Sequence, residues 1–330
     1  MTVLEVESHP DAIQSLTLPN ELTGSEGVAY SPAGDVIAVA TSDTNRVFLF
    51  RRKTDGQFAT APFLELGGQD GALSYPHDVS FAASGERELL AVAQRRGAIA
   101  IYQRNADDRT YGPKPIFEIC GSETQLKFSD GVAFVPPRYD HLAVCNWKTG
   151  TVSIYRQVSH SPVRFALKPV FVLQHPSVHR PDGLGFSACG RWLAVANHGS
   201  HTVSIYRRRT PILALGRLQY GPEPVTVIDD PSLCHPHSVA FNPGTNHLVV
   251  TNAGANYFSV YQPLGRGRHL RWSRSSSLRT TVAPEAAFRE VNGHNKMEGG
   301  PKGIAIHRDR LAICNPDYGI KIYRLREGLA

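Results

Sequence analysis

Six ionisable residues stand at equivalent positions in six copies of one repeated phrase. They are Glu26, His77, Asp130, Asp182, His237 and Lys302. Carboxylate oxygens suit Ca²⁺, Mg²⁺ or Mn²⁺, and neutral imidazoles add Zn²⁺ to that choice. A bound cation lowers the pKa of a bound water, and a nearby His or Lys can then act as a general acid or base.

These residue types define two predicted roles. The acidic members are the predicted metal ligands, namely Glu26, Asp130 and Asp182. The basic members are the predicted catalytic residues, namely His77, His237 and Lys302. The basic side chains could instead neutralise the carboxylates with no metal bound. A divalent cation is therefore one of two alternatives. No motif indicates an organic cofactor, because neither a GxSxG nor a phosphate-binding GxGxxG sequence is present.

A second set of polar residues follows the first at a similar spacing in every copy. Its members are Thr41, Gln94, Asn146, Asn197, Asn252 and Asn315. Together with His198 and His294, they are the predicted substrate-binding residues. A concave site with a few convergent polar groups is typical of small-molecule binding.

The elements that must position these residues are visible in the repeat itself. The clearest copies read PDGLGFSACGRWLAVANHGSHTVSIYRR at 181–208 and SDGVAFVPPRYDHLAVCNWKTGTVSIYRQ at 129–157. Their short β-branched segments, bounded by turns, predict three strands, and a fourth short run follows each copy. Four antiparallel strands form one blade of a β-propeller, so six copies predict an all-β, six-bladed propeller. In a propeller, the loops carrying both polar sets open on the same face.

The predicted ring occupies one domain, residues 1–330, with repeats beginning near 26, 77, 130, 182, 237 and 302. The fourth runs lie at 62–66, 115–119, 169–173, 224–228 and 286–291. Only three strands follow the last repeat start. We therefore expect the N-terminal segment 12–18 to supply the outer strand of the last blade and to close the ring without an open edge.

Charge and composition limit the functional classes only loosely. The net charge is +6, with a sequence pI near 9.1. A basic insertion at 265–281 and arginines after the third strands predict a basic face on the side of the propeller opposite the two polar sets. This face either is simply solvated or contacts an anionic partner. These arginines are Arg51, Arg52, Arg156, Arg207, Arg208, Arg209 and Arg324.

The cysteines and the apolar runs favour an intracellular protein. The five cysteines are widely spaced, so no disulfides are expected. No export signal is recognisable and no apolar run is long enough to cross a membrane, so we expect a cytoplasmic protein without a membrane partner.

Several repeats resemble those of lactonase-type propellers. The segments are LAVANHGSHTVSIYRR (193–208), HPHSVAFNPGTNHLVVTNAGANYFSVY (235–261) and EGVAYSPAGDVIAVATSDTNRVFLF (26–50). The chain is similar to the lactonase and YVTN repeat groups and to gluconolactonases, strictosidine-synthase-like proteins and NHL repeats. By that resemblance, Glu26 and the acidic Asp130 and Asp182 would hold a divalent cation at the channel mouth. His77, His237 and Lys302 depart from the pattern of those families.

Two functions remain open on the sequence. The first is a lactonase-like, metal-assisted hydrolase or isomerase acting on a small polar molecule at the channel mouth. The second is a noncatalytic propeller that binds a ligand, a protein or RNA. The first is the leading prediction.

Overall fold

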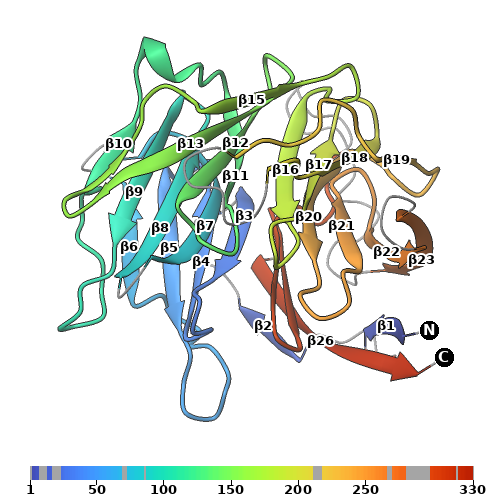
Figure 1. Cartoon of the computed structure of the whole chain (residues 1–330). Coiled ribbons are helices and arrows are strands. Elements are labelled where there is room, and N and C mark those ends of the chain that lie inside the picture. Colours follow the sequence, from blue (N-terminus) through green and yellow to red (C-terminus); the bar gives the residue numbers. More distant parts are fainter. Residues whose placement is uncertain are drawn as a thin grey trace.

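Six antiparallel sheets form the blades of a β-propeller, as predicted. The computed structural model describes residues 2–6, 13–16, 24–68, 73–84, 87–210, 218–265, 270–279, 298–316 and 319–329. Successive blades follow the chain around the ring, from the blue β3 to the red β26 (Figure 1). A short 3₁₀ helix, Ser122–Thr124, lies between two of the blades.

Each blade pairs its strands mostly in chain order. Blade 1 contains β3 (Ser25–Tyr30), β4 (Val36–Thr41), β5 (Arg46–Arg51) and β6 (Leu64–Gly67). Blade 2 contains β7 (Pro76–Ser84), β8 (Arg87–Gln94), β9 (Ala98–Gln103) and β10 (Phe117–Ile119). Blade 3 contains β11 (Ser129–Phe134), β12 (His141–Asn146), β13 (Thr151–His160) and β15 (Phe171–Gln174), with β14 (Val163–Phe165) paired to the end of β13.

The remaining blades repeat this arrangement. Blade 4 contains β16 (Pro181–Phe186), β17 (Trp192–Asn197), β18 (Thr202–Arg207) and β19 (Thr226–Asp229). Blade 5 contains β20 (Pro236–Phe241), β21 (Leu248–Asn252), β22 (Tyr257–Leu264) and β23 (Arg271–Arg279). Blade 6 contains β24 (Ile304–His307), β25 (Arg310–Asn315) and β26 (Gly319–Leu329), with β2 (Gln14–Leu16) outermost.

The ring closes as predicted, through the N-terminal segment. Strand β2 pairs with β26, with Gln14 opposite Ile322 and Leu16 opposite Ile320. Leu16 is fully buried in the apolar cluster between blades 6 and 1. A second N-terminal strand, β1 (Thr2–Val6), pairs with the far end of β26.

The prediction of a loop insertion at 265–281 in blade 5 is wrong in part. Within the predicted loop at 265–281, residues 271–279 form β23, the outer strand of the blade, which pairs with β22 from Tyr257 to Leu264. Trp272 accounts for this pairing, because it is buried against Trp192 and Phe241 of blades 4 and 5. The segment 286–291, predicted as the outer strand, lies outside the described residues.

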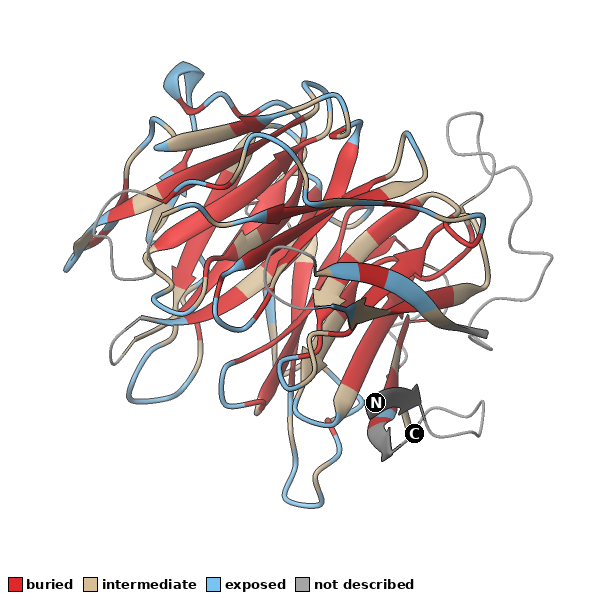
Figure 2. Ribbon diagram, turned by 45° about the vertical axis from the view of Figure 1, so that its right-hand side comes forward, coloured by how far each residue is buried: buried red, intermediate tan, exposed pale blue. Residues whose placement is uncertain are grey.

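Apolar side chains fill the spaces between the blades. The middle strands are buried on both faces, which fits their continuous β-branched and aliphatic sequences. Figure 2 shows this burial as red strands inside a paler rim. The aromatic residues near the ends of the third strands are among the largest fully buried side chains, including Tyr102, Tyr155, Tyr206 and Tyr261. They pack against neighbouring blades, so the repeated aromatic is part of the core.

The first strands of neighbouring blades meet around the channel at four glycines, namely Gly27, Gly131, Gly183 and Gly303. Each comes directly after one of the six ionisable residues. A Cβ on Gly183 would lie 2.5 Å from the carbonyl oxygen of His237, and one on Gly131 would lie 2.5 Å from that of Asp182. On Gly27 it would lie 2.6 Å from the Cα of Asp78. This backbone-to-backbone contact brings the ionisable side chains into one cluster.

Candidate functional site

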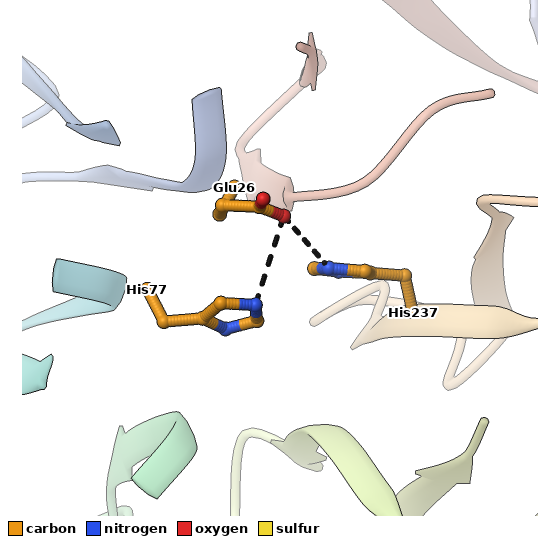
Figure 3. A group of neighbouring side chains, drawn as sticks. All are labelled: Glu26, His77 and His237. Atoms are coloured by element: carbon orange, nitrogen blue, oxygen red, sulfur yellow. Dashed lines mark hydrogen bonds and ion pairs between the residues drawn. The ribbon is translucent and has the colours of Figure 1, made fainter. Parts of the chain in front are cut away.

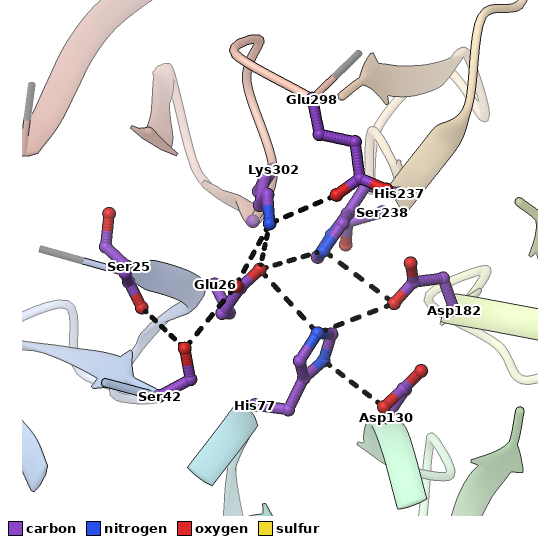
Figure 4. A network of polar contacts seen from close by, with 12 residues as sticks. Ser25, Glu26, Ser42, His77, Asp130, Asp182, His237, Ser238, Glu298 and Lys302 are labelled. Atoms are coloured by element: carbon purple, nitrogen blue, oxygen red, sulfur yellow. Dashed lines mark hydrogen bonds and ion pairs between the residues drawn. The ribbon is translucent and has the colours of Figure 1, made fainter. Parts of the chain in front are cut away.

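The six ionisable residues converge on the channel axis, as the repeat predicts. Five of them lie where the pairing of the first and second strands shifts register, between residue pairs such as Ser25/Gly27 and Pro181/Leu184. Such bulges re-aim a side chain out of the regular pleat. All six residues are buried, none being more than 6% exposed. With Arg95, His198 and Glu298 they form a largely buried network that we call the axial cluster. Figure 4 labels all of its members except Arg95 and His198.

Glu26 is surrounded by three basic side chains of the axial cluster. Its carboxylate accepts hydrogen bonds from Lys302 Nζ at 2.8 and 3.0 Å. The Nε2 atom of His237 lies 3.2 Å from Glu26 Oε2, and Nε2 of His77 lies 3.6 Å from the same oxygen (Figure 3). Burial opposes ionisation of Glu26, but the charge of Lys302 and the hydrogen bond from His237 hold the pKa of Glu26 well below its usual value.

The two aspartates differ in their partners. Arg95 donates from Nε to Asp130 Oδ1 at 2.7 Å. Asp182 has no such cation, and its Oδ1 has no hydrogen-bond partner among the described residues. Burial raises the pKa of Asp130 to about 6 against the opposing charge of Arg95. Burial and repulsion from Asp130 raise the pKa of Asp182 well above its usual value.

The basic members of the axial cluster also have shifted pKa values. Burial lowers the pKa of His237 to about 4, and burial together with the charge of Arg95 lowers the pKa of His77. Burial opposes the charge of Lys302, but Glu26 and Glu298 raise its pKa. At neutral pH both imidazoles are therefore neutral, while the Lys302–Glu26 pair is ionised.

The second polar set lies inside the blades and contacts their backbone. Asn146 Oδ1 accepts from the Lys127 N–H at 3.1 Å, and its Nδ2 donates to Ser153 at 3.0 Å. The same pattern recurs at Asn197 and Asn252. Gln94, Thr41 and Asn315 likewise bond to backbone groups. These contacts account for the set structurally, and its substrate-binding role stays a prediction.

Two further predicted substrate-binding residues have separate outcomes. His198 belongs to the axial cluster, with Nε2 2.9 Å from Glu298 Oε1 and Nδ1 3.3 Å from Asp182 Oδ2. His294 lies outside the described residues.

The residues two positions before the ionisable residues form a further set, with one member in each blade. In blades 2 to 5 this residue has a left-handed backbone, with φ of 56° at Tyr75, 60° at Phe128, 47° at Arg180 and 48° at His235. Glycine adopts this conformation without strain, whereas bulky side chains do so at a cost and often at functional sites. The carbonyl of Tyr75 accepts from the Arg95 N–H, and that of Phe128 from the Trp147 N–H, both at 3.1 Å.

Three of these residues and their neighbours form a continuous row on the channel face. The guanidinium of Arg95 lies over both Tyr75 and Phe128, 5.5 and 5.0 Å from their ring centroids. The rings of Phe128 and Trp147 are 5.5 Å apart, and Arg180 lies 4.9 Å over Trp147. We call these five residues the arginine–aromatic strip. Tyr75 is 37% and Phe128 39% exposed.

A cleft of about 560 Å³ adjoins one end of the strip. Its walls include Trp147, Lys148, His175, His179 and Arg180. Arg95, Phe128 and Arg180 of the strip were missed in the sequence analysis. Aligning the repeats two residues before each ionisable position would have found Phe128 and Arg180.

The opposite face carries the predicted third-strand arginines. Strand register places Arg51 opposite Val36, at the far end of blade 1 from the Ser25–Thr41 pair. Several cations on this side have local partners. Arg52 donates to the Gly56 carbonyl, and Arg104 and Arg109 contact Asp35. An anionic partner on this face stays a prediction.

Two further predictions concerned disulfide bonds and a membrane partner. All five cysteines are free. Within the part of the chain that the structure describes, no helix has the length and apolar character needed to cross a membrane.

Comparison with solved structures identifies the class of fold. The chain is similar to the WD40 repeats of RRP9, with a TM-score of 0.60, 11% identity and coverage of 98% of this chain and 100% of that one. It is also similar to the β-propeller domain of Cps50 (Swd1) from Myceliophteria thermophila, with a TM-score of 0.57, 13% identity and coverage of 92% and 84%. No protein-family model and no curated protein sequence matches the chain. At these identities the similarity shows a β-propeller fold alone.

These neighbours overturn the leading functional prediction. The propellers reported above, a WD40 repeat domain and the Cps50 (Swd1) domain, do not support the lactonase resemblance. The predicted lactonase-like hydrolase or isomerase is therefore wrong. The void lined by Glu26, His77, Asp182 and His237 within the axial cluster is about 10 Å³, which is too small for an organic molecule. The catalytic roles predicted for His77, His237 and Lys302 depend on that activity.

Proposed function

We propose that this protein is a noncatalytic binding propeller that holds single-stranded RNA on its arginine–aromatic strip. The observation that carries the proposal is the alternation of exposed rings and guanidinium groups across blades 2 to 4. Proteins that bind single strands combine aromatic rings, on which bases stack, with cations that follow the phosphates. Arginine also stacks on rings and binds phosphate through two N–H groups.

The charges around the strip support an anionic ligand. The surrounding loop segments are 73–76, 94–97, 121–128, 147–150 and 174–180. They carry Arg95, Arg96, Lys127, Lys148 and Arg180, against the single acidic residue Glu123. Arg96, Lys127, Lys148 and Arg180 are exposed. An excess of cations beside exposed rings is the combination expected for a nucleic-acid surface.

The strained backbone adds a second argument. Tyr75, Phe128 and Arg180 hold their left-handed conformation where glycine would fit without strain. Each costs on the order of 1–3 kcal/mol, and such strain persists where the surrounding structure imposes it, often at functional positions. An acidic protein segment would use the cations of the strip but would not require its rings, so we favour RNA.

Binding to a 12-nucleotide oligouridine, followed by fluorescence anisotropy, tests this proposal. We expect Phe128→Ala and Tyr75→Ala each to weaken binding by about 5- to 150-fold, since stacking contributes about 1–3 kcal/mol per base. Arg180→Ala should also reduce the salt dependence of the binding constant, because it removes a phosphate contact. The matched control is Phe117→Ala. Phe117 lies on the outer strand of blade 2, and the Arg164 guanidinium lies 5.4 Å from its ring centroid, so this is an arginine–aromatic pair outside the strip.

A polyglutamate peptide of similar charge provides the competing ligand. Tighter binding of the peptide than of the RNA, unchanged by Phe128→Ala, would assign the strip to an acidic protein partner and overturn the RNA proposal. The proposal also fails if oligouridine does not bind, or if Phe117→Ala weakens binding as much as Phe128→Ala does.

A further inference from the structure

We infer that four side chains of the axial cluster form a binding site for a divalent transition-metal ion such as Zn²⁺. The site takes one atom from each of four blades, namely Glu26 Oε2, His77 Nε2, Asp182 Oδ1 and His237 Nε2. It differs from the predicted set of three carboxylates, because Asp130 is bound to Arg95 and two imidazoles take part. The inference does not rest on the proposed RNA binding.

The four atoms form a closed loop with similar edges. His77 Nε2 lies 3.6 Å from Glu26 Oε2 and 3.8 Å from Asp182 Oδ1. His237 Nε2 lies 3.2 Å from the glutamate oxygen and 3.7 Å from the aspartate oxygen. Zinc binds histidine nitrogen and carboxylate oxygen at about 2.0–2.2 Å, so the edges of a tetrahedral site are about 3.3–3.6 Å. The four distances around the loop, 3.2 to 3.8 Å, lie in or close to that range.

Two features of the surrounding protein point to a ligand inside this loop. A void of about 10 Å³ is lined by Glu26, His77, Asp182 and His237, and this is close to the space that a single water or ion occupies. The Oδ1 atom of Asp182, a residue only 3% exposed, has no hydrogen-bond partner among the described groups. A buried polar atom normally has a partner, and a cation in the void would supply one.

The charge of the axial cluster also favours a cation. Its carboxylates are Glu26, Asp130, Asp182 and Glu298, whereas its permanent cations are Lys302 and Arg95. The axial cluster therefore holds two more carboxylates than permanent cations. A divalent ion would balance this excess. Mixed imidazole and carboxylate ligands suit zinc and related metals better than calcium or magnesium, which prefer oxygen alone.

Arg95 is a built-in competitor for this site. Its Nη2 lies 2.7 Å from His77 Nε2, and since a guanidinium only donates, the imidazole nitrogen accepts this contact. A metal ion needs the same lone pair. Metal binding must therefore displace Nη2 from His77, while Nε can keep its bond to Asp130. Removing Arg95 should consequently strengthen metal binding.

Calorimetric titration of the metal-free protein with Zn²⁺ and Co²⁺ tests the site. We expect one ion per chain, with a visible Co²⁺ spectrum of the intensity typical of tetrahedral coordination. His237→Asn and Asp182→Asn each remove a ligand and should weaken binding by at least about 100-fold, since loss of an outer-sphere partner alone costs 10–100-fold. Arg95→Gln should strengthen binding by about 10-fold or more. The control is His175→Asn, because His175 pairs with Glu223 on the exposed rim.

Circular dichroism must show that each variant is folded. The Arg95→Gln variant keeps the inference testable if ligand variants fold poorly, because its predicted effect has the opposite sign. Zn²⁺ binding that is unchanged in His237→Asn and lost in His175→Asn would place the ion on the rim and overturn the inference. Weaker binding in Arg95→Gln, or no binding to the wild-type protein, would overturn it too.

Discussion

Replacing Lys302 with Met should lower the free energy of unfolding by about 3–5 kcal/mol, measured in EDTA, because it leaves a buried carboxylate without its cation. Lys302 Nζ lies within 3.0 Å of both oxygens of Glu26, and both residues are only 6% exposed. Glu26 is held ionised mainly by this partner. Urea unfolding followed by tryptophan fluorescence measures the loss.

The double variant Glu26→Gln/Lys302→Met separates the charge from the packing. It removes both members of the pair, so most of the lost stability should return. Lys148→Met, on the exposed rim, is the matched control and should change stability by less than about 0.5 kcal/mol. A Lys302→Met protein as stable as the control would mean that Glu26 finds another partner or takes up a proton.

Replacing Gly183 with Ala should destabilise the protein by about 3 kcal/mol, at the upper end of overpacking costs. The new Cβ would lie 2.5 Å from the carbonyl oxygen of His237 and 2.7 Å from the Cα of Ser238. Both are backbone atoms of the neighbouring first strand, so no side-chain rotation relieves the clash. The two strands must separate, and the axial cluster must separate with them.

Gly112→Ala is the control, because the nearest atom to its Cβ is the Lys114 carbonyl oxygen at 3.8 Å. That substitution should be neutral or slightly stabilising, since it reduces the freedom of the unfolded chain. Thermal unfolding of both variants makes the comparison. Equal melting temperatures would show that neighbouring blades can move apart at little cost.

The blades were predictable because each repeat carries the same strands and turns, and closure by segment 12–18 followed from a missing strand. Convergence of residues as distant as Glu26 and Lys302 was predictable for the same reason. The sequence did not show that Arg95 would bind Asp130. This contact crosses from blade 2 to blade 3, and the residue after Gln94 varies in type among the repeats.

The polar residues of the second set illustrate a different limit. Asn146, Asn197 and Asn252 have the composition of a binding site, yet their amides hold the entrance loops by backbone hydrogen bonds. Residue type alone does not distinguish a side chain facing a ligand from one facing its own backbone. Strand β23 escaped prediction because its sequence, RWSRSSSLR, is largely polar and lacks the apolar alternation of a strand.

The pairing of β1 with the end of β26 has a mechanical consequence. Thr2 lies opposite Leu329 and Val6 opposite Leu325, and both ends of the chain lie together in Figure 1. Tension applied between these ends acts along the interstrand hydrogen bonds of an antiparallel pair, so the bonds break one after another. The β1 arm should therefore peel away at low force, while the pairing of Gln14–Leu16 that closes the ring stays intact.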